Sequence, residues 1–133
     1  MPPLRMHHEH HPGATVIALA GELDLATAPA LHHFVHEVRR RPADHLIFDM
    51  ADVAFVDSSG LRVLLDAYTV AHQFGGAIHL TALSGAPARL IEVTKLDERF
   101  RLHTTTANAL AAILAGPGRP APDVDTVTSI DRT

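Results

Sequence analysis

Short apolar segments alternate with amphipathic segments along most of this chain, and this alternation limits the folds that it can adopt. Residues 14–20 and 45–50 are short, mostly apolar runs, typical of buried strands. Between them, from Thr27 to about Arg39, apolar residues recur at the three- and four-residue spacing of a helix with one buried face. A helix that connects two strands in this way favours a crossover between parallel strands. The pattern therefore predicts an α/β domain.

The same alternation continues to about residue 114. The turn at Pro12-Gly13 predicts that residues 4–10 form an edge strand that pairs back on the first buried strand. A loop is expected through Asp52 and Val56. The later elements are predicted to be a helix from Ser58 to the Gly75-Gly76 stop, a strand over 77–81, a helix over 86–96 with Leu90, Ile91, Val93 and Leu96 on its apolar side, a strand over 100–104 and a helix over 106–114. We expect a mixed sheet of four or five strands with four helices.

The length of 133 residues fits one domain. After Gly116 the chain is rich in proline and then in aspartate, threonine and serine, with only isolated apolar residues. Such a segment buries too little apolar surface to offset the entropy lost on ordering. We therefore predict a domain over residues 1–115 and a disordered C-terminal tail over residues 116–133.

Charge and composition exclude several classes of function. A formal net charge of −4 disfavours binding to nucleic acid or to an anionic membrane surface. The absence of cysteine removes disulfides, thiol nucleophiles and thiolate metal sites. The first residues contain no apolar signal core, and no apolar run approaches the ~18–20 residues of a membrane span. We expect a cytoplasmic protein that binds neither nucleic acid nor membrane.

Ser58 lies where the loop after the second buried strand leads into a helix, in the segment Asp-Ser-Ser-Gly at residues 57–60. The first turn of a helix presents unpaired N–H groups and the positive end of the helix dipole. Ser58 is therefore predicted to be the N-cap, and a phosphate on it would meet the same donors. Phosphorylation adds about 1.5–2 negative charges, which can block a docking surface without unfolding the helix.

Two segments carry a family resemblance. Residues 21–24, Gly-Glu-Leu-Asp, and residues 57–61, Asp-Ser-Ser-Gly-Leu, resemble the two signature segments of bacterial STAS domains. Within that family the chain is similar to the anti-sigma factor antagonists. The resemblance covers about residues 4–114 and includes Gly75-Gly76 before a strand and the helix of Pro87. It implies a single STAS domain.

The resemblance also implies a partner-switching cycle in transcription regulation. The unphosphorylated antagonist binds an anti-sigma factor of the ATP-binding serine kinase type and frees a sigma factor. The kinase then phosphorylates Ser58, the complex dissociates, and a serine phosphatase resets the cycle. By this resemblance the chain has no catalytic residue, cofactor or metal. Asp24 and Asp57 shape the loop around Ser58. The other residues of the switch loop and partner surface are Ser59, Gly60 and Leu61.

Other functions remain open at this stage. A serine at a helix start is usually only a cap. A STAS subunit of another signalling scaffold or of a transport complex is one alternative, and a small nucleotide-binding or hydrolysing protein is another, suggested by the phosphate-friendly helix start. Acyl transfer by Ser58 is disfavoured because no Gly-x-Ser-x-Gly elbow surrounds it.

The remaining polar clusters have plain structural interpretations. The N-terminal histidines around Glu9, and the pair His32 and His36, have spacings that can bind Zn²⁺, but we interpret them as solvated. Histidines in the first predicted helix leave the identity of the partner open. We also expect residues 39–41, which are all arginine, to form a solvated helix end. The carboxylates of Asp49 and Asp52 are expected to be hydrogen-bonded to nearby backbone N–H groups.

Overall fold

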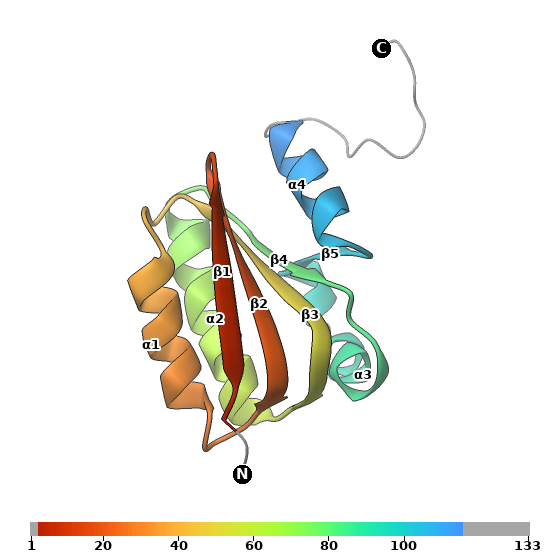
Figure 1. Ribbon diagram of the computed structural model, residues 1–133. Coiled ribbons are helices and arrows are strands. Elements are labelled where there is room, and N and C mark those ends of the chain that lie inside the picture. Colours follow the sequence, from red (N-terminus) through yellow and green to blue (C-terminus); the bar gives the residue numbers. More distant parts are fainter. Residues whose placement is uncertain (1–2, 116–133) are drawn as a thin grey trace.

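The sheet has five strands in the order β1-β2-β3-β4-β5 in a computed structural model that describes residues 3–115 (Figure 1). Strand β1 (Arg5–His11) is antiparallel to β2 (Ala14–Leu23). Strands β2, β3 (His45–Val56), β4 (Ile78–Thr81) and β5 (Arg101–His103) are mutually parallel. This arrangement confirms the predicted mixed sheet. The segment 116–133, predicted to be disordered, lies outside the described residues.

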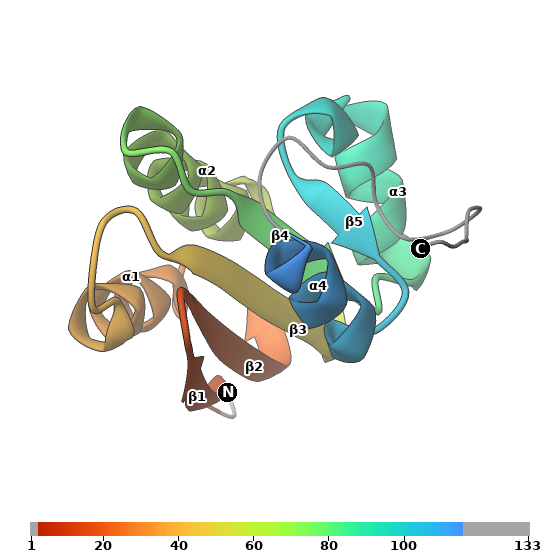
Figure 2. The same ribbon diagram turned by 90° about the horizontal axis from the view of Figure 1, so that it is seen from above.

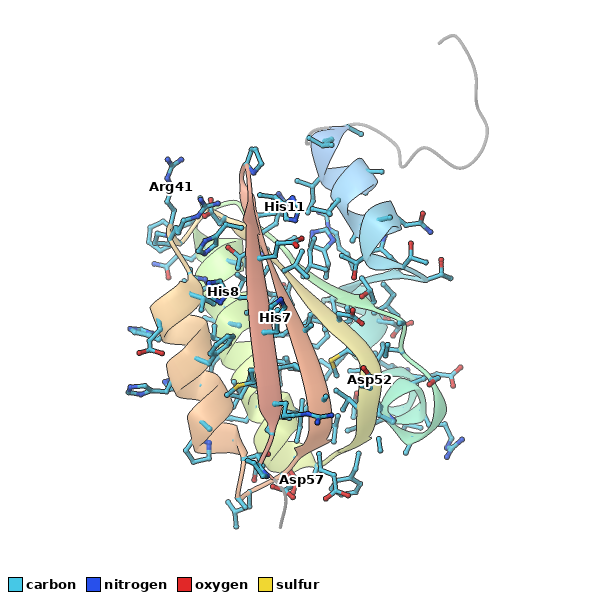
Figure 3. The ribbon with its side chains drawn as sticks, in the orientation of Figure 1. His7, His8, His11, Arg41, Asp52 and Asp57 are labelled. Atoms are coloured by element: carbon cyan, nitrogen blue, oxygen red, sulfur yellow. The ribbon has the colours of Figure 1, made fainter. Side chains whose placement is uncertain are left out.

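Helices cover both faces of the sheet. Helices α1 (Ala28–Val38) and α2 (Ser58–Gln73) lie on one face, and α4 (Thr106–Leu114) lies on the other (Figure 2). Helix α3 (Gly85–Val93) packs against β3, near the part of that strand that carries Asp52 (Figure 3). Within residues 3–115 no helix is long and apolar enough to cross a membrane.

The alternation of side chains along β3 divides the core between the two faces. Leu46 and Phe48 point into the larger core beneath α1 and α2, whose helices contribute Leu31 and Leu64. Ile47 points to the opposite face and packs in a smaller cluster under α4. The helical stripe predicted for α1 is confirmed, since Leu31, Val35 and Val38 are buried.

Strand β3 is longer than predicted. The expected loop through Asp52 and Val56 is strand, because β2 continues to Leu23 and pairs with it along this length. Two register shifts in the β2–β3 pairing, each with one extra residue in β3, accommodate the longer strand. The carboxylate of Asp49 accepts a hydrogen bond from the N–H of Ala51 at 3.1 Å, as expected for that side chain.

The predicted helix over 86–96 is divided in two. Helix α3 ends at Val93, and Lys95, with a φ of 60°, separates it from the short 3₁₀ helix η1 (Leu96–Glu98). The assignment of Val93 to the apolar side was wrong, because its side chain is 76% exposed. The hydroxyl of Thr94 donates to the carbonyl oxygen of Leu90 at 2.6 Å, which satisfies an acceptor at the helix end.

The arginines at residues 39–41 were predicted to be a solvated helix end. This prediction was wrong for Arg39 and Arg40. The guanidinium of Arg39 donates to the carbonyl oxygen of Ala67 in α2 at 3.0 Å. The guanidinium of Arg40 donates to the carbonyl oxygen of His11 in β1 at 2.7 Å. These two side chains tie the end of α1 to its neighbours in the fold.

Three histidines form a hydrogen-bonded row across the α4 face of the sheet. His45 Nδ1 lies 3.1 Å from His79 Nε2, and His79 Nδ1 lies 2.9 Å from His103 Nε2. The three residues come from β3, β4 and β5 and are staggered along the strands. A neutral imidazole donates through one nitrogen and accepts through the other, so the row satisfies both nitrogens of the buried His79.

Burial makes the charged form of this row unfavourable. Desolvation is the largest cause and lowers the pKa of His79 to about 3, with further lowering by the nearby His45, His103 and Arg101. Burial and then Arg101 also lower the pKa of His45, against an opposing effect of Asp44. The pKa of His103 is lowered by burial and Arg101. Below a pH of about 6.5 these three histidines therefore bind more protons in the unfolded chain than in the folded protein.

We predict that acid destabilises the fold through this row. Its contribution to stability is complete above pH ~6.5 and is lost as the pH falls towards ~3, by at most about 1.4 kcal/mol per pH unit for each histidine. His79→Gln, which does not titrate, should flatten this part of the profile. The measurement is the free energy of unfolding by urea at several pH values.

The matched control is His33→Gln, on the exposed surface of α1. It should keep the wild-type dependence on pH. Equal slopes for the wild type and His79→Gln between pH 6.5 and pH 4 would contradict the prediction.

Candidate functional site

The two segments singled out in the sequence meet at one end of the sheet. Strands β2 and β3 are parallel neighbours, so Leu23 and Val56, near their carboxyl ends, lie side by side. The backbone N–H of Asp57 donates to the carbonyl oxygen of Leu23 at 2.9 Å. Asp57 lies at the end of the molecule opposite Arg41 (Figure 3). Parallel pairing thus joins segments that are more than thirty residues apart.

Asp57, not Ser58, is the N-cap of α2. Its Oδ1 accepts hydrogen bonds from the N–H of Ser59 at 2.8 Å and from the N–H of Gly60 at 3.2 Å. Its backbone carbonyl accepts from the N–H of Leu61 at 2.9 Å. The prediction that Ser58 caps the helix was therefore wrong. An ionised carboxylate is a stronger acceptor than a hydroxyl for these donors.

Ser58 is the first residue of α2 and its side chain is exposed. Because Asp57 supplies the cap, α2 does not depend on the Ser58 hydroxyl for its start. The hydroxyl is accordingly open to modification at an ordered helix end. Ser59, the next residue, is half-buried.

Gly60 allows α2 to lie directly against the end of β2. A Cβ atom at Gly60 would lie 2.6 Å from the Cβ of Leu23 and 2.8 Å from its carbonyl oxygen. Both distances are shorter than real Cβ atoms tolerate. The backbone of Gly60 is helical, a conformation that any residue can adopt. Glycine is therefore required here because α2 and β2 approach so closely.

Asp24 organises the neighbouring loop, between β2 and α1. Its Oδ1 accepts from the N–H groups of Ala26 and Thr27, each at 3.0 Å. The hydroxyl of Thr27 donates to the carbonyl oxygen of Glu22 at 2.7 Å and accepts from the N–H of Asp24 at 3.0 Å. Thr27 stands at the N-cap position of α1, but its side chain makes no capping bond to the helix. Asp24 shapes the loop beside Ser58, whereas Asp57 shapes the turn that carries it.

An open groove lies between the starts of α1 and α2. Its volume is about 420 Å³. The side chain of Leu25, which is 76% exposed, lines one side of it. The lining residues come from the β2–α1 loop, α1 and α2, and they are Leu25, Ala28, Pro29, His32, Ser58, Ser59, Arg62 and Val63. The groove is mainly apolar, and the guanidinium of Arg62 and the imidazole of His32 line it together with Ser58.

The predicted site residues have three different places in the structure: the groove lining, the loops beside the groove, and the core. Ser58 and Ser59 line the groove, and Asp24 and Asp57 hold the two loops beside it. Leu61 is only 8% exposed and belongs to the core, so it packs α2 on the sheet and is not available to a partner. Gly60 is buried as well.

Sequence reasoning missed the groove residues contributed by α1 and by the loop before it. Leu25 carried one signal, because a large apolar residue in a polar loop is unusual. No sequence signal related His32 to Arg62, since these residues are thirty positions apart and on different helices.

A larger hollow of about 740 Å³ lies elsewhere, between α3 and the strands β4 and β5. Leu80, Leu83 and Ile91 supply apolar lining, and His103 reaches it from the histidine row. It contains none of the residues of the two segments. Within residues 3–115, no group of three or more histidine, aspartate or glutamate side chains is placed to hold a metal ion.

Comparison with known protein families places the fold and both segments within one family. The sequence model of the STAS domain matches residues 5–109. A curated anti-sigma F factor antagonist from Paenibacillus polymyxa is 30% identical over 111 residues, which are 83% of this chain and 95% of that protein.

Two mycobacterial proteins give a similar result. The anti-sigma-F factor antagonist RsfB of Mycobacterium tuberculosis is 32% identical over 108 residues, covering 80% of this chain and 86% of RsfB. The crystal structure of an anti-sigma factor antagonist from Mycobacterium paratuberculosis superposes with a TM-score of 0.74 at 33% identity, covering 84% of this chain and 94% of that one.

We predict that Gly60→Ala destabilises the protein by about 1–3 kcal/mol, the usual cost of overpacking a close contact. The added methyl group would collide with Leu23 and push α2 away from β2. Urea unfolding monitored by circular dichroism measures the effect. Ser58→Ala, in the same turn but exposed, is the matched control and should change stability by less than about 0.5 kcal/mol. Equal stability of the two variants would show that the contact is not tight.

Proposed function

This chain belongs to the STAS domain family, and we propose that it is an anti-sigma factor antagonist whose partner binding is switched off by phosphorylation of Ser58. The observation that carries the proposal is an exposed serine on a helix capped by another residue, Asp57, beside an open apolar groove. Such a serine can be reached by a kinase and modified without unfolding the helix.

The groove supplies a surface for the unphosphorylated state. Leu25 is a large apolar side chain that protrudes next to Ser58, and burying it against a partner would be favourable. A phosphate on Ser58 would bring negative charge to the rim of that surface and would have to lose its hydration on docking. Binding and phosphorylation therefore compete for the same place.

The finer features of the proposal follow the family. The partner is an anti-sigma factor of the ATP-binding serine kinase type, and a serine phosphatase restores the unmodified protein. The chain is then a regulatory ligand and a kinase substrate without catalysis of its own. We also propose that it acts in the cytoplasm, through a domain over 1–115 followed by a disordered tail, without binding nucleic acid or membrane.

We predict that Ser58→Ala binds the anti-sigma kinase with wild-type affinity and is not released by ATP. Ser58→Asp should bind at least about tenfold more weakly, because a carboxylate desolvated at an interface costs more than 1.4 kcal/mol. Isothermal titration calorimetry measures both affinities. Intact-mass analysis after incubation with ATP and the kinase should show one phosphate on wild type and none on Ser58→Ala.

The control for this experiment is Thr69→Ala, an exposed hydroxyl further along α2. This variant should bind and be phosphorylated like wild type. Phosphate found on Ser59 or Thr69 with Ser58 unmodified, or equal binding by Ser58→Ala and Ser58→Asp, would overturn the switch.

Two alternative functions have distinct outcomes. A subunit of another signalling scaffold or of a transport complex would retain a different protein in pull-down and would ignore the anti-sigma kinase. A nucleotide-hydrolysing protein would turn over ATP or GTP by itself. We expect the purified chain to hydrolyse neither.

A further inference from the structure

Three of the N–H donors at the start of α2 are already engaged and are not free to bind a phosphate on Ser58. The carboxylate of Asp57 already accepts from Ser59 and Gly60, and the Asp57 carbonyl accepts from Leu61. The phosphate would also be repelled by that carboxylate, which is its sequence neighbour. The positive charge that balances the phosphate must come from side chains.

Arg62 is placed to be the first of these partners. Residues four apart on a helix are neighbours on one face, about 5–6 Å apart at their Cβ atoms, so Arg62 lies one turn beyond Ser58. Its side chain is 81% exposed and its Nε is 4.0 Å from a carboxylate oxygen of Asp66, the long contact of a weak surface pair. A dianionic phosphate can recruit that guanidinium at little cost.

His32 is placed to be the second partner. It comes from α1 and lines the same groove as Ser58 and Arg62, from the opposite side. Its neighbour His33 is not part of the groove. An imidazole can donate an N–H to a phosphate oxygen whether it is neutral or protonated.

We propose that Arg62 and His32 form a phosphate clamp, a site for the phosphomonoester on Ser58 that bridges α1 and α2. This inference rests on the proposed phosphorylation of Ser58. In the clamp, the guanidinium binds the phosphate from the α2 side and the imidazole donates to it from the α1 side. Asp57 keeps its capping bonds throughout.

The clamp gives phosphorylation a steric effect as well as an electrostatic one. The exposed side chains of Leu25 and Pro29 line the same groove as Arg62 and His32. A phosphate held across the groove would cover this apolar surface, which a partner would otherwise contact. The switch then hides the docking surface and does not depend on charge repulsion alone.

The charged or titratable side chains on the elements around Ser58 include Asp57 at the cap, Arg62 and Asp66 on α2, His32 on α1 and Asp24 in the adjoining loop. Because three of these residues are acidic, replacing Arg62 or His32 should change the ionisation of the phosphate. The phosphate's own second ionisation, near pH 6 for phosphoserine, reports this directly.

The test uses full-length protein in which phosphoserine is installed at position 58 during expression. A titration followed by ³¹P NMR gives the second pKa of the phosphate. We expect Arg62→Gln to raise that pKa by about half a pH unit, a threefold change in acidity, and His32→Gln to raise it by a smaller amount. Arg62→Lys, which keeps the charge, should restore most of the wild-type value.

Two matched variants serve as controls. His33→Gln changes the adjacent histidine of α1, and Arg41→Gln removes an arginine at the opposite end of the molecule (Figure 3). Neither should move the phosphate titration.

A clamp also predicts that the Arg62 side-chain N–H signal shifts on phosphorylation and that this shift is reduced in His32→Gln.

The outcomes separate this proposal from the function on which it rests. If Arg62→Gln and His32→Gln titrate like wild type and like the controls, the clamp is wrong, whether or not Ser58 is the switch. If the titration shifts as expected, the clamp is supported even where the kinase leaves Ser58 unmodified, because the phosphoserine is installed independently. In that second case the proposed regulation, and not the clamp, fails.

Discussion

The contact between Leu23 and the start of α2 is the interaction on which the site depends. The Leu23 carbonyl accepts the N–H of Asp57, and the Leu23 side chain leaves space for no more than a hydrogen at Gly60. Through this contact, the end of β2 fixes where α2 begins and how closely it approaches the sheet. The groove beside Ser58 and the position of the β2–α1 loop follow from that placement.

The same region divides its tasks between two adjacent residues. Asp57 turns inward and satisfies the helix donors, while Ser58 faces outward and takes no part in capping. A modification of Ser58 can therefore alter the surface while the helix beneath it is unchanged. Had Ser58 been the cap, adding a phosphate would have altered the start of the helix as well.

The opposite face of the sheet has a separate role. Under α4 the apolar cluster is small, and next to it the buried His79 is satisfied by hydrogen bonds to His45 and His103. Burial favours the neutral form of these residues, so this face links stability to pH. The groove beside Ser58 lies on the other side, between α1 and α2. Stability and partner binding can thus respond to different stimuli.

The sequence by itself determined the order of the elements, because hydrophobic periodicity and the Gly75-Gly76 stop are local signals, and its two short segments indicated the family. It failed where distant pairing decides: β3 extends to Val56 because β2 lies beside it. Only the tertiary structure assigned the cap to Asp57, explained Gly60 through Leu23, and brought His32 and Arg62 to one groove. These features depend on how separate elements pack, and no local pattern encodes a packing distance.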